Sequence, residues 1–257
     1  MGKVIIDMET TTIPISLIGE MAGLCWGADI TDKEKNYKRG VDCIQSGHGR
    51  TLEYPNIIMT LDGYSARVIR EFYTHIGGAP TRLQASTRYI DYKDFKYVTP
   101  PKIANFDLSK VPNHTCSSPQ EIYDGVMKHV CQALEALEYC GIPREDSAMI
   151  LPLAMTTKVV VKVNLRELVQ IFNQRLCTRA YWEFRELMND IKNALVEYGD
   201  AYWNYLPGFV NEWGAIAKHL FVPKCVKDGV CYEKYSCGRA PKAERKEFNW
   251  FYLKKML

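Results

Sequence analysis

The segment from Thr156 to Val163 constrains the fold of this chain more than any other. It reads Thr-Thr-Lys-Val-Val-Val-Lys-Val, and β-branched residues of this kind favour extended strands. The next four residues, Asn164-Leu-Arg-Glu167, have the pattern of a capping box, which begins a helix. We therefore predict a strand that leads directly into a long helix, straight or kinked, ending near Tyr198. The predicted apolar stripe of this helix is Leu168, Phe172, Leu176, Ala180 and Phe184.

The remaining periodicity predicts a mixture of strands and helices. Short apolar runs predict strands at Val4–Ile6 and Asn56–Leu61 and an extended segment at Arg88–Tyr92. Helical spacing and start signals predict helices at Ala28–Ser46, Tyr64–Tyr73 and Ser118–Tyr139, with an irregular loop over residues 94–116. The pattern indicates one α/β domain over residues 1–220, followed by a Cys-containing extension over residues 221–257.

Composition excludes several classes of protein. Of the 257 residues, 47% are hydrophobic and 25% are charged, which is enough apolar material for a core and excludes global disorder. A net charge of +3 is too small to indicate a nucleic-acid or membrane partner. No apolar run approaches the roughly 18 residues of a membrane span, and the first residues do not resemble a signal peptide. We expect a cytoplasmic protein with mostly reduced cysteines.

Two segments concentrate arginine. Residues 66–92 contain Arg67, Arg70, Arg82 and Arg88 around a Gly-rich turn, which suits an anionic ligand because glycine lets the backbone approach and Arg binds phosphate bidentately. A solvated turn between a helix and a strand is the alternative interpretation.

The second segment is the helix that follows Asn164. Arg175 and Arg179 are four residues apart and would share a face, with Arg166 nine residues before Arg175 on the same side. The alternative is a surface ion pair between Arg179 and Glu183.

These features, in their order along the chain, resemble those of flavin-dependent thymidylate synthases. The resemblance runs from about Gly47 to Trp203. It is carried by His75, Ser86-Thr-Arg-Tyr89, Gly141-Ile-Pro-Arg-Glu145, Leu151-Pro-Leu153, Asn164-x-Arg166 and Arg175 through Ala180-Tyr-Trp-Glu183.

The resemblance implies an α+β fold with a central, mostly antiparallel sheet and long helices. It also implies reductive methylation of dUMP to dTMP, in which methylenetetrahydrofolate supplies the carbon and FAD relays hydride from NADPH. Enzymes of this family are homotetramers with shared active sites and use no Cys nucleophile. The implied partners are dUMP, the folate co-substrate and other copies of the chain, without nucleic acid or membrane.

The resemblance also implies roles for individual residues. Arg175 would stabilise the negative charge that develops on the pyrimidine at N3, and Ser86 would orient the ring; these two are the candidate catalytic residues. The candidate cofactor-binding residues are Thr51, Glu53, His75, Asn164, Arg166, Gln170 and Arg179. The candidate substrate-binding residues are Arg70, Glu71, Arg82, Gln84, Ala85, Ser86, Thr87, Arg88 and Arg175.

This chain departs from the family pattern at three cationic positions. The family motif is Arg-His-Arg, seven residues and Ser, whereas this chain has Thr74-His75-Ile76 and nine residues before Ser86. A further Arg before the Leu-Pro pair is Ala148 here. Arg82 is the first candidate to replace the lost charges, with Arg70 and Arg179 next.

The extension contains His219, Cys225, Cys231 and Cys237 at intervals of six residues. Four such ligands suit zinc, but the common signature has Cys pairs two to four residues apart. We interpret them as ordinary thiols and assign no metal, with a zinc site and a disulfide as alternatives.

Two other functions stay open. The chain is either a relative that modifies another pyrimidine nucleotide or a non-catalytic homologue that binds nucleotide or nucleic acid. Retention of His75, Ser86, Arg88, Asn164, Arg166 and Arg175 argues against a lost activity, because a decaying site has no reason to keep all six.

Overall fold

A single antiparallel sheet organises the fold. The computed structural model describes residues 2–75, 77, 80–110, 118–203 and 210–243. Within them lies a four-stranded sheet in the order β1-β2-β4-β3, with every neighbouring pair antiparallel. Its strands are β1 (Lys3–Ile6), β2 (Asn56–Ser65), β3 (Thr81–Gln84) and β4 (Thr156–Asn164). The predicted α+β fold with an antiparallel sheet is therefore confirmed.

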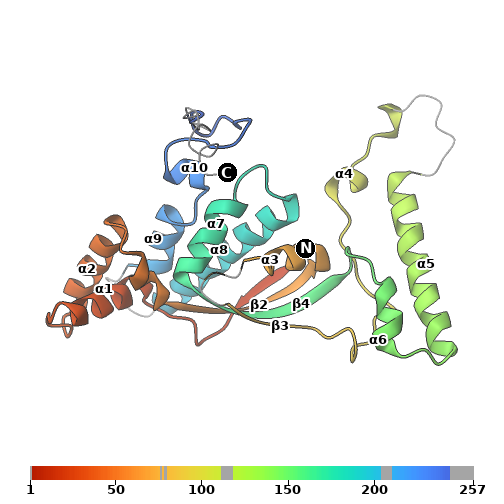
Figure 1. Cartoon of the computed structure of the whole chain (residues 1–257), viewed down its shortest axis with the longest axis horizontal. Coiled ribbons are helices and arrows are strands. Elements are labelled where there is room, and N and C mark those ends of the chain that lie inside the picture. Colours follow the sequence, from red (N-terminus) through yellow and green to blue (C-terminus); the bar gives the residue numbers. More distant parts are fainter. Residues whose placement is uncertain (1, 76, 78–79, 111–117, 204–209, 244–257) are drawn as a thin grey trace, which may run out of the picture.

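The two central strands bury one face of the sheet and leave the other accessible. In β2, Ile57 and Met59 are fully buried, and in β4 so are Val159 and Val161. The residues that alternate with them face the other way, and Val160 is 42% exposed. Within the part of the chain that the structure describes, helices such as α3, α7 and α8 therefore cover one side of the sheet (Figure 1).

The helices outside the projecting part of the chain, residues 85–110 and 118–155, are mostly amphipathic. They are α1 (Pro14–Cys25), α2 (Lys33–Gln45), α3 (Ala66–Phe72), α7 (Leu165–Arg175), α8 (Trp182–Trp203), α9 (Glu212–His219) and the short α10 (Lys224–Lys227). The largest side chains of the core are Trp213, Phe72, Phe172, Phe184 and Phe221. Of the helices that the structure describes, none is long and apolar enough to cross a membrane.

The predicted passage from strand to helix is confirmed at β4 and α7. The Asn164 side chain caps α7 by accepting the backbone N–H of Glu167 at 2.9 Å. The predicted helical stretch to about Tyr198, straight or kinked, is instead two helices, because α7 ends at Arg175 and α8 begins at Trp182. Arg185 stabilises the intervening turn by donating to the carbonyls of Thr178 (2.6 Å) and Ala180 (2.8 Å).

Residues 85–110 and 118–155 form an arm that projects from the sheet (Figure 1). It carries α4 (Pro101–Ala104), α5 (Pro119–Tyr139) and α6 (Arg144–Ser147) around a small core of Phe95, Met127, Leu134 and Met155.

Short 3-10 turns complete the described secondary structure and lie at Gly49–Glu53 (η1), Leu108–Lys110 and Ala148–Ile150. The predicted helix after Ser118 is confirmed with its capping box, in which Ser118 and Glu121 exchange hydrogen bonds of 3.1 and 2.7 Å.

Other boundaries differ from the predictions. Helix α1 was not predicted, and α2 begins at Lys33 rather than Ala28, because Asp32 accepts the backbone N–H groups of Glu34 and Lys35. Residues 88–92 form no strand; the edge strand is β3, which pairs with Val159–Lys162 of β4. The edge of β4 offers unpaired backbone groups, and pairing with them outweighs the weak strand pattern of β3.

The segment after α9 returns to the body of the protein. Phe221 belongs to the main core and stacks on Phe172 with ring centroids 3.9 Å apart. Beyond α10, an isolated bridge joins Cys231 to Lys242. The predicted boundary at residue 220 therefore falls just before a core residue.

Candidate functional site

Arg175 is held by three neighbours at the end of α7. Its Nε donates to Nε2 of His75 at 2.9 Å, and its Nη1 lies 3.7 Å from a carboxylate oxygen of Glu71. The guanidinium carbon lies 4.8 Å from the ring centroid of Phe184. The side chain is 24% exposed, so the fixed cation still reaches the surface. Residues from three helices and a loop therefore meet at one charged group.

His75 is buried beside this cation and is neutral at pH 7. Its ring packs edge-on against Phe184 with centroids 5.9 Å apart. Burial, with the charges of Arg175 and Arg82, lowers the pKa of His75 to about 4. Because Nε2 accepts the hydrogen bond from Arg175, the ring proton lies on Nδ1.

Arg82 lies on β3 next to His75. It donates to the backbone carbonyl of Tyr73 at 3.1 Å and to that of His75, and its guanidinium carbon lies 4.9 Å from the centroid of the Tyr73 ring. Its buried Nε has no hydrogen-bond partner among the described residues. Burial lowers the pKa of Arg82, which is a further sign of a cation drawn into the protein.

Glu167 also lies in this region. The sequence pattern indicated only a helix-capping role for it. It is buried, and burial raises the pKa of its carboxyl, while the charge of Arg82 acts in the opposite direction. A Cβ at Gly77 would lie 2.4 Å from Oε2 of Glu167, so a larger residue there would displace the Glu167 carboxylate. The sequence signal for a buried Glu167 was its position next to Leu168, a residue of the predicted apolar stripe.

A second group of predicted residues gathers at the start of α7. Arg166 forms an ion pair with Glu53, and a Cβ at Gly49 would lie 3.6 Å from Nε of Arg166. Thr51, in the same 3-10 turn as Glu53, donates its hydroxyl to the carbonyl of His48 at 2.7 Å. Asn164 caps the helix here, and Gln170 is exposed one turn further along. The structure therefore brings Arg166 and Glu53 into contact, with Thr51 in the same 3-10 turn as Glu53 and Asn164 at the cap of the helix that carries Arg166.

The third group follows β3 along the chain. Ala85 donates its N–H to the carbonyl of Lys158 at 2.8 Å, and Gln84 donates its amide to the hydroxyl of Thr157 at 3.3 Å. Arg88 is exposed and lies 2.9 Å from Glu145, while its N–H donates to the hydroxyl of Ser86 at 3.2 Å.

The two remaining candidate cations lie outside these groups. Arg70 is exposed on α3. Arg179 forms an ion pair of 3.1 Å with Glu233 of the extension, not with Glu183, whose carboxylate accepts from Ser65 inside the core. The arrangement therefore places Arg82 beside His75 but ties Arg179 to the C-terminal extension.

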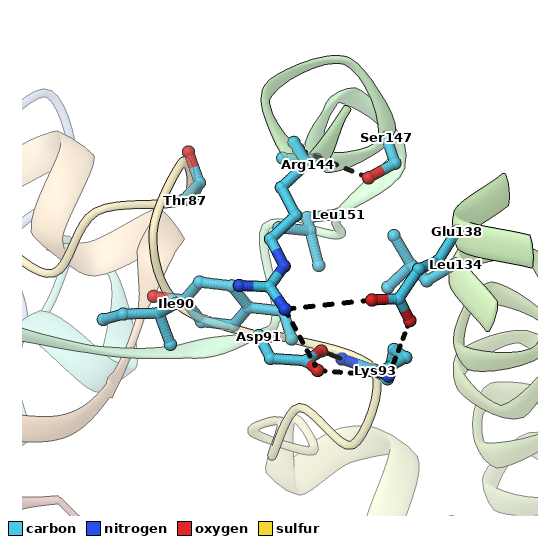
Figure 2. Close-up of a pocket in the computed structure, with 11 residues that line it drawn as sticks. Thr87, Ile90, Asp91, Lys93, Leu134, Glu138, Arg144, Ser147 and Leu151 are labelled. Atoms are coloured by element: carbon cyan, nitrogen blue, oxygen red, sulfur yellow. Dashed lines mark hydrogen bonds and ion pairs between the residues drawn. The ribbon is translucent and has the colours of Figure 1, made fainter. Parts of the chain in front are cut away.

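Figure 2 shows another cation, Arg144, which lines a cavity of the arm. It lies one helical turn before Ala148, and both line a cavity of about 30 Å³ together with Thr87. Its guanidinium is 3.8 Å from both Asp91 and Glu138. The sequence motif Gly141-Ile-Pro-Arg-Glu145 contains Arg144, but no spacing rule pointed to it as a substitute for the missing charge.

Comparison with known proteins gives these groups a context. The family model described as "Thymidylate synthase complementing protein" matches residues 8–198. Two similar proteins carry the name flavin-dependent thymidylate synthase. The one from Clostridium tetani is 25% identical over 95% of this chain and 97% of its own. The one from Nitratidesulfovibrio vulgaris is 28% identical over 82% of this chain and 79% of its own.

The fold is also similar to solved structures. The structure of flavin-dependent thymidylate synthase ThyX from Helicobacter pylori complexed with FAD and dUMP superimposes with a TM-score of 0.58 and 19% sequence identity. The match covers 79% of this chain and 97% of that chain. At this identity the similarity concerns the fold.

Proposed function

The chain belongs to the thymidylate synthase complementing protein family, and from this we propose that it methylates dUMP reductively to dTMP. The resemblance seen in the sequence is confirmed at the level of family and fold. We propose methylenetetrahydrofolate as carbon donor, NADPH as reductant and FAD as bound cofactor. The relatives named above are flavin-dependent thymidylate synthases by name, and the Helicobacter structure holds FAD and dUMP.

The observation that carries the proposal is the way Arg175 is held. A guanidinium fixed by His75, Glu71 and Phe184 needs no reorganisation when negative charge develops on a bound pyrimidine. Arg also keeps its proton at every working pH. Arg175 therefore suits the task of stabilising the pyrimidine as N3 loses its proton.

The residues around Arg175 fit a flavin. The buried Nε–H of Arg82 has no partner among the described residues, so an acceptor atom of a ligand would satisfy it. Arg166 is 46% exposed and offers a planar donor group suited to phosphate. When bound, FAD supplies the hydride relay between NADPH and the one-carbon unit. His75, neutral with its proton on Nδ1, would donate a hydrogen bond without adding charge.

The remaining groups would hold the substrate. Ser86 and Arg88 lie in one loop after β3, with a hydroxyl and a guanidinium to meet a polar, anionic nucleotide. Arg82 is the proposed replacement for the lost cations, because it lies on β3 and its guanidinium contacts the backbone at His75.

The experiment that tests this function has two readouts. The visible absorption spectrum of the purified protein with FAD should show bound flavin, and adding dUMP should perturb it. Tritium release from dUMP labelled at C5 should then require FAD, NADPH and methylenetetrahydrofolate together.

Each other outcome rejects the proposal in a defined way. Bound flavin without any response to dUMP would indicate a different pyrimidine nucleotide as substrate. Failure to bind FAD would indicate a non-catalytic homologue. Binding of oligonucleotides with a steep salt dependence would support a nucleic-acid partner instead.

We further propose that the enzyme is a homotetramer that works in the cytoplasm. The accessible face of the sheet and the exposed apolar residues of the arm are surfaces that other copies would cover. The eight cysteines that the structure describes are free thiols, as expected in a reducing compartment.

A further inference from the structure

Half of the cysteines that the structure describes line a single cavity. Cys177 lies in the turn between α7 and α8, and Cys225, Cys231 and Cys237 come from the extension. The cavity has a volume of about 310 Å³. His219, which shares the six-residue spacing in the sequence, lines a different cavity between α1, α2 and α9. The fourth side chain of the group is therefore Cys177 and not His219. Cys177 lies nearly fifty residues upstream of Cys225, so the spacing in the sequence did not indicate it.

Two hydrogen-bond donors lie beside the sulfur of Cys237. The sulfur accepts hydrogen bonds from the backbone N–H of Arg239 and the side chain of Thr178. Gly238, between Cys237 and Arg239, has φ +86°, a conformation that glycine adopts without strain. Such second contacts to the donor atom are typical of metal ligands.

The charges around the cavity suit a group of thiolates. Arg179 and Lys224 both line it, and the charge of Arg239 also acts on Cys237. A zinc ion with four thiolates carries a net charge of −2, so nearby cations would stabilise it. Glu233 balances Arg179 only in part, through an ion pair that is about half exposed on both sides.

The part of the extension that the structure describes, residues 221–243, has few buried apolar residues to hold it in place. Beyond Phe221, only Cys231 and Ala240 are buried among its described apolar residues, and its regular structure is α10 and one isolated bridge. Small, loop-rich segments of this kind usually depend on a metal or a disulfide. Arg239 adds one polar link, donating to the carbonyl of Leu176 at 3.2 Å.

We propose that Cys177, Cys225, Cys231 and Cys237 bind a structural zinc ion, which fastens the extension to the turn that follows Arg175. Within the described residues, no group of three or more His, Cys, Asp or Glu is close enough together to hold a metal ion. Binding therefore requires the four sulfurs, which line the same cavity, to move together until each lies about 2.3 Å from the metal.

The proposal does not depend on the function proposed above. Three of the four cysteines lie beyond residue 198, where the family match ends. Zinc would act by holding the extension, since four thiolates leave no open position for a substrate.

The test measures metal in the full-length protein, purified with a reductant and without a chelator. Mass spectrometry of the metal content should give about one zinc per chain, and replacement by Co²⁺ should give the visible bands of a tetrahedral thiolate site. Cys177→Ser and Cys237→Ser should lose the metal. Cys140→Ser is the matched control, because Cys140 is exposed like Cys237 but does not line the cavity.

Thiol alkylation of the wild-type protein gives an independent readout, which does not require any variant to fold. Cys25 and Cys140 should react at once, whereas the four cavity cysteines should react only after a chelator removes the zinc. Three results would overturn the proposal: wild type without stoichiometric metal, equal metal in Cys237→Ser and wild type, or disulfides among the four cysteines in the freshly purified protein.

Discussion

Arg175 depends on its surroundings as much as on its own chemistry. The sequence shows an Arg near the end of a helix, but only the fold brings His75 and Glu71 to it, from 100 and 104 positions earlier in the chain. Both contacts hold the guanidinium in one orientation, which is the condition for stabilising charge without reorganisation. A catalytic role for Arg175 is therefore a claim about geometry and can be tested as such.

We predict that Arg175→Ala lowers kcat by about 100- to 1,000-fold, the usual cost of removing one preorganised donor of this kind. Arg175→Lys should recover only part of the activity, because Lys keeps the charge but lacks the planar fork. Steady-state kinetics checks the prediction, with circular dichroism and size-exclusion chromatography confirming an unchanged fold and assembly. Full activity in Arg175→Ala would refute the site assignment.

His75 should make the folded state sensitive to mild acid. Its pKa falls from an ordinary value of 6.5 to about 4 in the folded protein, so between these values the unfolded chain binds more protons. Stability is therefore lost as pH falls through this window, and pH 5 should cost about 2 kcal/mol relative to pH 7. The free energy of unfolding in urea should show this loss in wild type and not in His75→Gln. Equal losses in both proteins would mean that other groups cause the acid sensitivity.

At the scale of elements, glycine sets how closely α1 and α2 pack. A Cβ at Gly40 would lie 2.0 Å from the carbonyl oxygen of Ile15, and one at Gly19 would lie 1.8 Å from that of Asn36. Neither contact can be relieved by moving a side chain, because the obstructing atoms belong to the backbone. The two helices therefore touch backbone to backbone.

We predict that Gly40→Ala lowers the free energy of unfolding by about 1–3 kcal/mol, the usual cost of overpacking. Gly125→Ala in α5 is the matched control, because nothing lies within 4 Å of the place where its Cβ would stand and helix propensity favours Ala by about 0.5–1 kcal/mol. Urea unfolding of both variants checks the pair. An unchanged free energy of unfolding in Gly40→Ala would show that α1 and α2 can move apart without loss of stability.

Elements with strong local signals could be predicted from the sequence, and those set by distant partners could not. The capping boxes and apolar patterns at Ser118 and Asn164 act within a few residues, so they sufficed to predict α5 and the junction of β4 with α7. Strand β3 forms because β4 offers it an edge, and the end of α7 at Arg175 depends on Arg185 and the turn it stabilises. These are tertiary effects that periodicity does not contain.

The same division holds for the candidate site. The ordered motifs pointed to Arg166 and Glu53, which the fold pairs, and to His75 and Arg175, which it joins by a hydrogen bond. Buried Glu167 could not be recognised, because its contact with Gly77 exists only in three dimensions. The grouping of Cys177 with the cysteines of the extension could not be predicted for the same reason.

At the scale of the whole molecule, the arm carries exposed apolar side chains that the other described residues do not cover. On α5, Ile122 is 53% and Val126 is 52% exposed, and one helical turn separates them on the same face. Met149 and Leu153, also on the arm, are 85% and 50% exposed. Apolar groups concentrated in this way on a projecting element indicate a surface made for another protein chain.

We predict that Ile122→Glu combined with Val126→Glu converts the proposed tetramer into smaller species, because burying two carboxylates in an apolar interface is costly. Light scattering coupled to size-exclusion chromatography measures the change in mass. Trp26→Glu is the control, since Trp26 is 62% exposed at the far end of α1, away from the arm. If the active sites are shared between subunits, the double variant should also bind FAD more weakly while retaining its helical circular dichroism. A double variant that stays tetrameric would show that subunits meet elsewhere, with the accessible face of the sheet as the next surface to test.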